Sequence, residues 1–205
     1  YINTYTMDSV FCFRANGTPR WIKKYYTIGS SVYDVVPTYF STVLIQLRDT
    51  LYDVDSTGNN IRFRTPFSFT SKITTLPDSD FILADSSKII KQDFSGNQRW
   101  TLNAPGFVVA GANSINVYAK TLNEVMKINT SSGSVIWTKP ISSNEFTMTL
   151  DHGFITTDST QVSRYDSSGT LLWSKAILLP HFGLKGIVET PTKSIVTGGC
   201  FLNMN

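Results

Sequence analysis

Short runs of alternating apolar and polar residues follow one another along this chain of 205 residues. Alternation over so few positions is typical of half-buried β-strands, and no stretch carries the 3.6-residue period of an amphipathic helix. Clusters of Asp, Asn, Ser, Thr and Gly separate the runs, and these residue types favour tight hairpin turns. The pattern therefore predicts an all-β protein built from short antiparallel strands.

A phrase made of an acid or amide, a small polar residue, a glycine and then a tryptophan returns along the chain. Its glycines are Gly17, Gly58, Gly96, Gly133 and Gly169, which follow one another after 41, 38, 37 and 36 residues. The tryptophans of the chain are Trp21, Trp100, Trp137 and Trp173, and each stands four residues after one of these glycines. The second copy departs from the phrase, because Arg62 stands where the tryptophan would be. A repeat of this length indicates a repeat architecture.

Each period holds four strand patterns joined by tight turns, which is the sequence signature of a β-propeller blade. We therefore expect a β-propeller of four-stranded antiparallel blades, a single domain over residues 1–205 with about five blades' worth of chain. Complete blades are expected at 30–66, 71–104, 105–140 and 145–178, and partial blades at 1–26 and 184–198. Such an arrangement is also similar to that of WD40 repeats.

The phrase in Asp93–Trp100, Asn129–Trp137 and Asp166–Trp173 resembles the PQQ-like repeats of the quinoprotein-type β-propellers. The copies at Asp55–Gly58 and Asn16–Trp21 match it less fully. The resemblance implies rings of roughly six to eight blades, which favours a fragment of a larger ring over a closed ring of five. It leaves several functions open, because the family includes redox enzymes, outer-membrane assembly scaffolds and secreted binding domains.

The repeated residues are interpreted as structural. Asp93 and Asp166 are expected to accept hydrogen bonds from the N–H groups of their turns, and the glycines to adopt a positive φ. The tryptophans are expected to be largely buried at the seam between adjacent blades, where a large flat side chain can cover both. The alternative is an aromatic platform for a ligand, which would require the tryptophans on one open face.

Composition narrows the class of function. Charged residues make up 16% of the chain, against about 25% in a typical soluble domain, and Ser, Thr and Asn replace them. This balance favours an extracytoplasmic protein (secreted, cell-surface or periplasmic), and phrases such as FITTDS resemble repeats of secreted bacterial proteins. The net charge of +3 has no basic run behind it, which argues against a nucleic-acid partner. No apolar run reaches the ~20 residues of a membrane span.

Candidate chemistry is sparse. The resemblance implies that a quinoprotein enzyme would carry an Asp base, a calcium site and a pair of adjacent cysteines. Cys12 and Cys200 are far apart in the sequence, His152 and His181 are isolated, and most acids lie in turn phrases. We therefore expect no catalytic residues, no metal site and no cofactor, with two free thiols or one Cys12–Cys200 disulfide. The alternative is a fragment of a quinoprotein-like redox enzyme.

Aromatic residues gather in two segments that would lie between blades. We predict a binding surface formed by Tyr25, Tyr26, Tyr33, Tyr39, Phe40, His181 and Phe182. Aromatic side chains commonly dominate contacts with proteins and can stack on sugars. The sequence thus predicts a binding or scaffolding module that engages a protein, or a glycan, through one rim. In the alternative, Tyr25–Phe40 is only a strand and a crossover, and His181 only packs.

Overall fold

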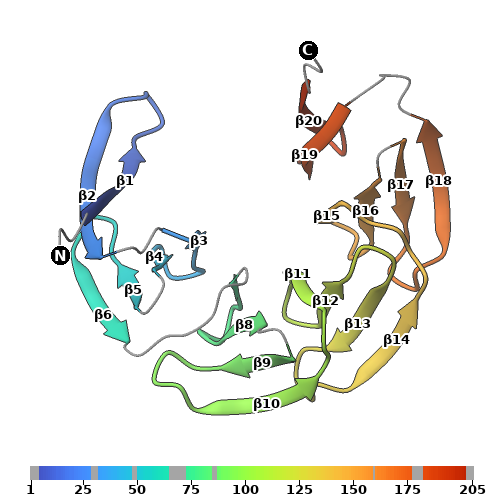
Figure 1. The fold of residues 1–205 in the computed structure, drawn as a ribbon, viewed down its shortest axis with the longest axis horizontal. Coiled ribbons are helices and arrows are strands. Elements are labelled where there is room, and N and C mark those ends of the chain that lie inside the picture. Colours follow the sequence, from blue (N-terminus) through green and yellow to red (C-terminus); the bar gives the residue numbers. More distant parts are fainter. Residues whose placement is uncertain are drawn as a thin grey trace. The chain divides into compact units, whose positions relative to one another are not determined.

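The computed structural model describes residues 5–28, 32–47, 50–64, 73–84, 87–158, 160–176 and 182–201. These residues form twenty β-strands, and none of them belongs to a helix that is long and apolar enough to cross a membrane. The prediction of an all-β protein is confirmed. The chain divides into two compact units, Tyr1–Pro105 and Gly106–Asn205, whose strands are drawn in Figure 1.

Ten strands make up the first unit. They are β1 (Tyr5–Phe13), β2 (Pro19–Ile28), β3 (Asp34–Pro37), β4 (Val43–Gln46), β5 (Leu51–Val54), β6 (Asn60–Arg64), β7 (Thr74–Thr75), β8 (Phe81–Ala84), β9 (Lys88–Gln92) and β10 (Gln98–Asn103). The first two strands pair as a two-stranded antiparallel sheet. The four-stranded sheets β3–β6 and β7–β10 follow it along the chain.

The second unit has the remaining ten strands. They are β11 (Val108–Ala112), β12 (Asn116–Lys120), β13 (Val125–Asn129), β14 (Val135–Lys139), β15 (Glu145–Met148), β16 (Phe154–Thr157), β17 (Gln161–Tyr165), β18 (Leu171–Ala176), β19 (Phe182–Glu189) and β20 (Ile195–Phe201). Sheets β11–β14 and β15–β18 are four-stranded, and β19 and β20 form a two-stranded sheet. In every four-stranded sheet the strands lie in chain order, so each is an antiparallel meander as the repeat predicts.

The hydrophobic core lies between consecutive sheets as well as on them. All four residues of β8 are buried, although alternate side chains of a strand point to opposite faces. Both faces of this inner strand are therefore covered. In the first unit, Leu44 packs in one cluster with Phe81 of the next sheet. In the second unit, the rings of Tyr118 and Phe154 lie 5.3 Å apart and join two sheets in the same way.

The turns between third and fourth strands are held by hydrogen bonds to the acid or amide residue that opens each turn, as the turn at Asp55 illustrates. The N–H groups of Thr57 and Asn59 donate to Oδ1 of Asp55 at 2.8 and 3.0 Å. The N–H of Gly58 donates to the carbonyl of Asp55 at 3.1 Å, with φ of 93° at the glycine. The corresponding glycines are Gly96, Gly133 and Gly169, with φ of 93°, 72° and 77°.

These hydrogen bonds favour the ionised form of the turn acids. The hydroxyl of Thr57 donates to Asp55 at 2.7 Å. This bond and those from the neighbouring N–H groups lower the pKa of Asp55 from 3.8 to about 2. The pKa values of Asp93 and Asp166 are also lowered, first by a side-chain hydrogen bond within each turn. The turns are therefore most stable where these acids are charged.

We expect the free energy of unfolding to decrease as the pH is lowered from about 4 to about 2. A carboxyl group with a lowered folded pKa stabilises the fold above its unfolded pKa of 3.8. It loses that contribution as the pH falls through its folded pKa, about 2 for Asp55. Chemical denaturation across this range measures the effect. Asp55→Asn should lose less stability on acidification than the native chain, and an identical acid profile would contradict this account.

A tryptophan of one sheet lies against the turn glycine of the next. A Cβ atom built on Gly58 would lie only 3.0 Å from Cγ of Trp21, so an alanine would crowd the indole ring. Two residues after this tryptophan, Nζ of Lys23 donates a hydrogen bond to the carbonyl oxygen of Gly58 at 2.8 Å. The sheet β1–β2 thus holds the turn of the sheet β3–β6 by one ring and one cation.

The second unit repeats this arrangement. A Cβ atom on Gly169 would lie 3.3 Å from Cη2 of Trp137 and 2.9 Å from Cδ of Lys139. Nζ of Lys139 donates to the carbonyl oxygen of Ser168 at 2.7 Å. We call the arrangement a clasp: the tryptophan of the last strand of one sheet covers the turn glycine of the following sheet, and the lysine two residues later binds a turn carbonyl. The recurring spacing of Gly and Trp in the sequence follows from this contact.

Trp100, Trp137 and Trp173 are partly rather than fully buried. The tryptophans lie on fourth strands, which form the outer side of their sheets. In β14, for example, three of the five residues are exposed. One side of the indole ring of Trp137 covers the turn of the following sheet, while the strand that carries it faces solvent.

A positive φ alone does not require glycine in these turns. The turn between β7 and β8 has the same backbone hydrogen bond as the turn at Gly58, because the N–H of Ser79 donates to the carbonyl of Leu76 at 3.2 Å. The residue with the positive φ, 68°, is nevertheless Ser79 and not a glycine. The turns between other first and second strands use Ser41, His152 and Lys193, with φ of 60°, 65° and 61°. Glycine is needed in a clasped turn because any side chain would meet the tryptophan.

Replacing Gly58 with alanine should destabilise the chain more than replacing Gly17, where an added Cβ meets nothing within 4 Å in the described part of the chain. Both variants carry the cost of a left-handed backbone, about 1–2 kcal/mol. Only Gly58→Ala adds crowding against Trp21, a further ~1–3 kcal/mol. Urea denaturation measures the difference. The extra cost should disappear in a Trp21→Ala background, and its persistence there would argue against the clasp.

Candidate functional site

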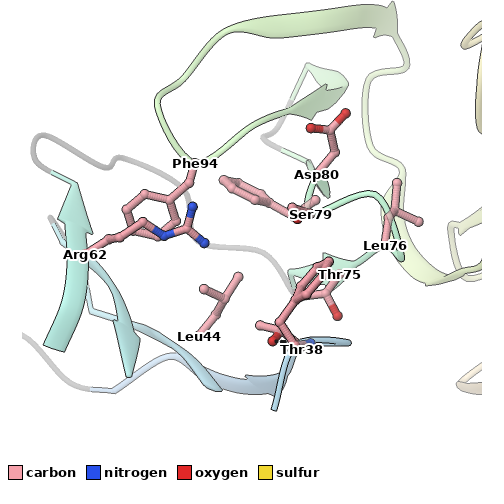
Figure 2. Close-up of a pocket in the computed structure, with 10 residues that line it drawn as sticks. Thr38, Leu44, Arg62, Thr75, Leu76, Ser79, Asp80 and Phe94 are labelled. Atoms are coloured by element: carbon pink, nitrogen blue, oxygen red, sulfur yellow. Dashed lines mark hydrogen bonds between the residues drawn. The ribbon is translucent and has the colours of Figure 1, made fainter. Parts of the chain in front are cut away.

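A hollow of about 300 Å³, open to solvent, lies between the sheets β3–β6 and β7–β10 of the first unit. Figure 2 shows Leu44 and Arg62 of the first of these sheets around the same space as Ser79 and Phe94 of the second. Two turns form its mouth, the turn from β3 to β4 and the turn from β7 to β8. The hollow therefore lies at the end of each sheet that carries the turn between its first and second strands.

The hollow has an apolar floor and an exposed aromatic mouth. Leu44, Phe81 and Phe94 are buried and belong to one core cluster. Phe40 also lines the hollow, yet 56% of it is exposed, and its neighbour Tyr39 is 58% exposed. An apolar depression bordered by exposed aromatic residues is the usual form of a surface that binds another molecule.

The turn that carries the two exposed aromatic residues is held by its own hydrogen bonds. Its ends are joined by a bond from the N–H of Thr38 to the carbonyl of Thr42 at 2.9 Å. The hydroxyls of these two threonines lie 2.8 Å apart, and the N–H of Phe40 donates to the hydroxyl of Thr38 at 3.1 Å. The aromatic side chains are thus presented on an ordered backbone, which reduces the entropy lost on binding.

Arg62 closes one wall of the hollow. Its guanidinium group donates to Oδ2 of Asp53 from Nε at 2.8 Å and from Nη2 at 2.5 Å. The same group lies 4.3 Å from the ring centre of Phe94, within the range of a cation–π contact. The ion pair therefore holds Arg62 to β5 of its own sheet, and the aromatic contact joins it to the turn of the next sheet.

The acid of the opposite wall is also paired. Asp80 accepts a hydrogen bond from Nε of Arg99 at 3.1 Å and lies 3.5 Å from Nζ of Lys91. Because Arg62 and Asp80 are already engaged, the hollow offers mainly apolar surface to a ligand. Among the residues that the structure describes, no group of three or more His, Cys, Asp or Glu side chains could hold a metal ion. Cys12 is a free thiol, and the side chain of Cys200 lies outside the described residues.

The structure separates the aromatic residues that the sequence groups together. Tyr39 and Phe40 lie at the mouth of the hollow, whereas Tyr33, 47% exposed, precedes the opposite end of β3. Tyr25 is corrected: it is only 6% exposed, and its ring lies 5.3 Å from that of Tyr52 in the core. The reason is the alternation of β2, which turns this side chain to the same face as Trp21. His181 and the side chains of Tyr26 and Phe182 lie outside the described residues.

Sequence reasoning missed Arg62 and Phe94, although two departures from the repeat mark them. Arg62 stands at the position of a tryptophan, and Phe94 follows the turn acid where the other copies have Ser56, Thr130 and Ser167. The two departures occur in consecutive sheets and their side chains touch. Between these two sheets, the contact of Arg62 with Phe94 therefore replaces the contact of a tryptophan with a turn glycine. The hollow lies beside the Arg62–Phe94 contact.

Four-stranded antiparallel meanders, repeated along the chain and joined through their faces, define the protein as a β-propeller. Residues 85–197, more than half of the chain, match the family model of the outer membrane protein assembly factor BamB. The chain belongs to this family, and the resemblance to PQQ-like repeats is confirmed. A search of the curated proteins finds no significant match to this sequence.

Solved structures agree on the fold. BamB from Moraxella catarrhalis is 17% identical, with a TM-score of 0.62 over 93% of this chain and 64% of that chain. The WD40 propeller domain of Doa1 is 11% identical, with a TM-score of 0.70 over 93% of this chain and 68% of that one. A chain of the mitotic checkpoint complex is 15% identical, with a TM-score of 0.74 over 94% and 65%. This chain therefore spans less than two thirds of the length of that BamB.

Replacing Arg62 with methionine should destabilise the first unit by about 1–3 kcal/mol. The change removes the partner of Asp53, whose side chain is only 1% exposed, and leaves a buried carboxylate without its cation. Chemical denaturation measures the loss. Asp53→Asn combined with Arg62→Met should recover part of the stability, since no buried charge then remains. If the Arg62→Met variant were as stable as the native chain, the Arg62–Asp53 ion pair would contribute nothing to stability.

Proposed function

We propose that this chain is a non-enzymatic binding and scaffolding module of the BamB family, which engages a protein partner through the hollow beside Phe40. The observation that carries the proposal is the pair of exposed aromatic residues, Tyr39 and Phe40, on a hydrogen-bonded turn above an apolar floor. In this proposal residues 1–205 form one propeller-type domain, and the turns at this end of the sheets are its working rim.

The chemistry of the hollow favours a polypeptide partner. An apolar floor that opens to solvent can receive an apolar or aromatic side chain of a protein segment. The polar groups at the mouth, such as the hydroxyl of Ser79, can meet backbone groups of that segment. A glycan would instead stack on the exposed rings without filling the floor, so a protein fits more of the surface.

The family supports the same direction. It is the family of an outer membrane protein assembly factor, which supports an extracytoplasmic location, periplasmic or associated with the outer membrane. The charges of the hollow are used in ion pairs between strands and turns rather than left for catalysis. We therefore favour scaffolding over the redox chemistry of quinoprotein relatives, and a module that needs no cofactor.

Removing the aromatic mouth should weaken partner binding by at least ~30-fold, the effect of losing an interface residue worth about 2 kcal/mol. A photo-crosslinking amino acid at position 40, used in the native host, identifies the partner by mass spectrometry. Its affinity for the purified chain is then compared with that for a Tyr39→Ala/Phe40→Ala variant. Leu122→Ala and Leu150→Ala form the matched control, because both leucines are as exposed but lie outside the hollow.

Two outcomes would count against this function. Unchanged affinity of the Tyr39/Phe40 double variant would remove the hollow from the binding surface. Stoichiometric binding of pyrroloquinoline quinone and calcium, with oxidation of an alcohol or sugar by a dye-linked assay, would favour the enzyme alternative. The two results are independent, because the first concerns the surface and the second the class of protein.

A further inference from the structure

The guanidinium group of Arg62 has hydrogen-bond donors that the fold does not use. Its Nε and Nη2 donate to Oδ2 of Asp53, but Nη1 has no acceptor among the residues that the structure describes. The side chain of Arg62 is 49% exposed, whereas that of Asp53 is 1% exposed. Figure 2 shows the guanidinium group reaching from β6 towards the space beside Phe94 and Leu44. The N–H groups of Nη1 are therefore available to a ligand in the hollow.

A second unused group lines the hollow, in the turn between β7 and β8. Ser79 is exposed, and its hydroxyl has no hydrogen-bond partner within the described part of the chain. The other hydroxyls of the lining are engaged. The hydroxyl of Thr38 lies 2.8 Å from that of Thr42, and the hydroxyl of Thr75 donates to the carbonyl oxygen of Pro37 at 2.8 Å. The serine hydroxyl can therefore donate to the same ligand as the guanidinium group.

The acid of the lining does not compete for these donors. Asp80 accepts a hydrogen bond from Arg99 at 3.1 Å and lies 3.5 Å from Nζ of Lys91. Figure 2 shows its carboxyl group pointing away from Arg62. The remaining acid, Asp53, holds the guanidinium group in one orientation, which reduces the entropy lost when a ligand binds. The hollow is thus complementary to an apolar group that carries a hydrogen-bond acceptor, and a carboxylate is the strongest acceptor for such donors.

The cation and the apolar floor lie close together. The guanidinium carbon of Arg62 is 4.3 Å from the ring centre of Phe94, which packs in one cluster with Leu44. A ligand that uses both must carry its carboxylate close to its apolar side chain. In an extended segment, adjacent side chains point to opposite sides, and the next on the same side lies about 7 Å further along. Only at the C-terminus of a chain do an apolar side chain and a carboxylate share one Cα atom.

We propose that the hollow binds the C-terminal residue of a polypeptide, where that residue has a large apolar side chain. The side chain lies on the floor formed by Leu44 and Phe94, and Phe40 covers it from the mouth. The terminal carboxylate accepts hydrogen bonds from Nη1 of Arg62 and from the hydroxyl of Ser79. Capture of a chain end by converging donors is a recurrent mode of peptide recognition. This inference rests on the proposed function, because it names the part of a protein partner that the same hollow holds.

The test uses synthetic peptides that end in phenylalanine and differ only in a free C-terminal carboxylate or a C-terminal amide. Each peptide is titrated into the isotope-labelled chain, and the side-chain signals of Phe40 and Arg62 are followed by NMR. We expect the free acid to bind about tenfold more tightly than the amide, which is the effect of one hydrogen bond to a charged group. Two control peptides isolate the chain end. An amidated peptide with glutamate before its phenylalanine should bind as the plain amide does, and a free acid that ends in serine should not bind.

Two variants test Arg62 without leaving an unpaired buried carboxylate. Asp53→Asn removes the negative charge that opposes the ligand, so the free acid should bind about threefold more tightly while the amide binds as before. Loss of folding cannot produce such a gain. In Asp53→Asn combined with Arg62→Met, the acid and the amide should bind equally. Arg20→Met removes an exposed arginine that does not line the hollow, and it should keep the tenfold preference.

Several results would overturn the inference. They are equal binding of the acid and the amide by the native chain, no response of Phe40 to either peptide, binding of the serine-ending acid, or a preference for the acid that survives in the double variant. Equal binding of acid and amide would leave the proposed function standing, since an apolar side chain would still occupy the hollow. That function is judged separately, by the affinity of the crosslinked partner for the Tyr39→Ala/Phe40→Ala variant.

Discussion

The packing of an indole ring on a bare glycine is the contact on which the rest of this structure depends. A four-stranded sheet has two faces, and its inner strands are apolar on both, so it is stable only between neighbours. The clasp fixes how one sheet meets the next, because the ring fits only where a Cβ is absent and the lysine fits only where a carbonyl points outward. Where a clasp forms, a hydrophobic cluster packs against its tryptophan, Trp21 in the first unit and Trp137 in the second.

The hollow exists where this contact is replaced. Between β3–β6 and β7–β10, Arg62 and Phe94 substitute a cation–π contact for an indole on a glycine. The guanidinium group is narrower than an indole and is turned back towards Asp53 by its ion pair. Space therefore remains beside the seam, and the turn with Phe40 borders it. A local exchange in the repeat thus converts a structural seam into a surface that can receive a ligand.

Much of the fold could be predicted from the sequence, because it rests on features with a fixed period. The alternation of apolar and polar residues predicted the strands, the Asp and Gly residues predicted the turns, and the spacing of the repeat predicted the four-stranded sheets. The candidate site could be predicted only in part. Tyr39 and Phe40 were found from composition, but Arg62 and Phe94 lie 32 positions apart and meet only in the folded chain. Tyr25 was misplaced because the phase of β2 was not followed from Trp21 onwards, which would have turned it inward.

The turns between first and second strands have a consequence for how such a protein can diversify. Their left-handed position is occupied by serine, histidine or lysine, at Ser41, Ser79, His152 and Lys193, so these turns do not depend on glycine. Each of these residues carries a modest backbone strain, on the order of 1–3 kcal/mol, that is spread over separate sheets. In return, the tip of each sheet tolerates a variable side chain on an unchanged backbone. Recognition can therefore change by single substitutions at these tips without a change in the backbone of the turn.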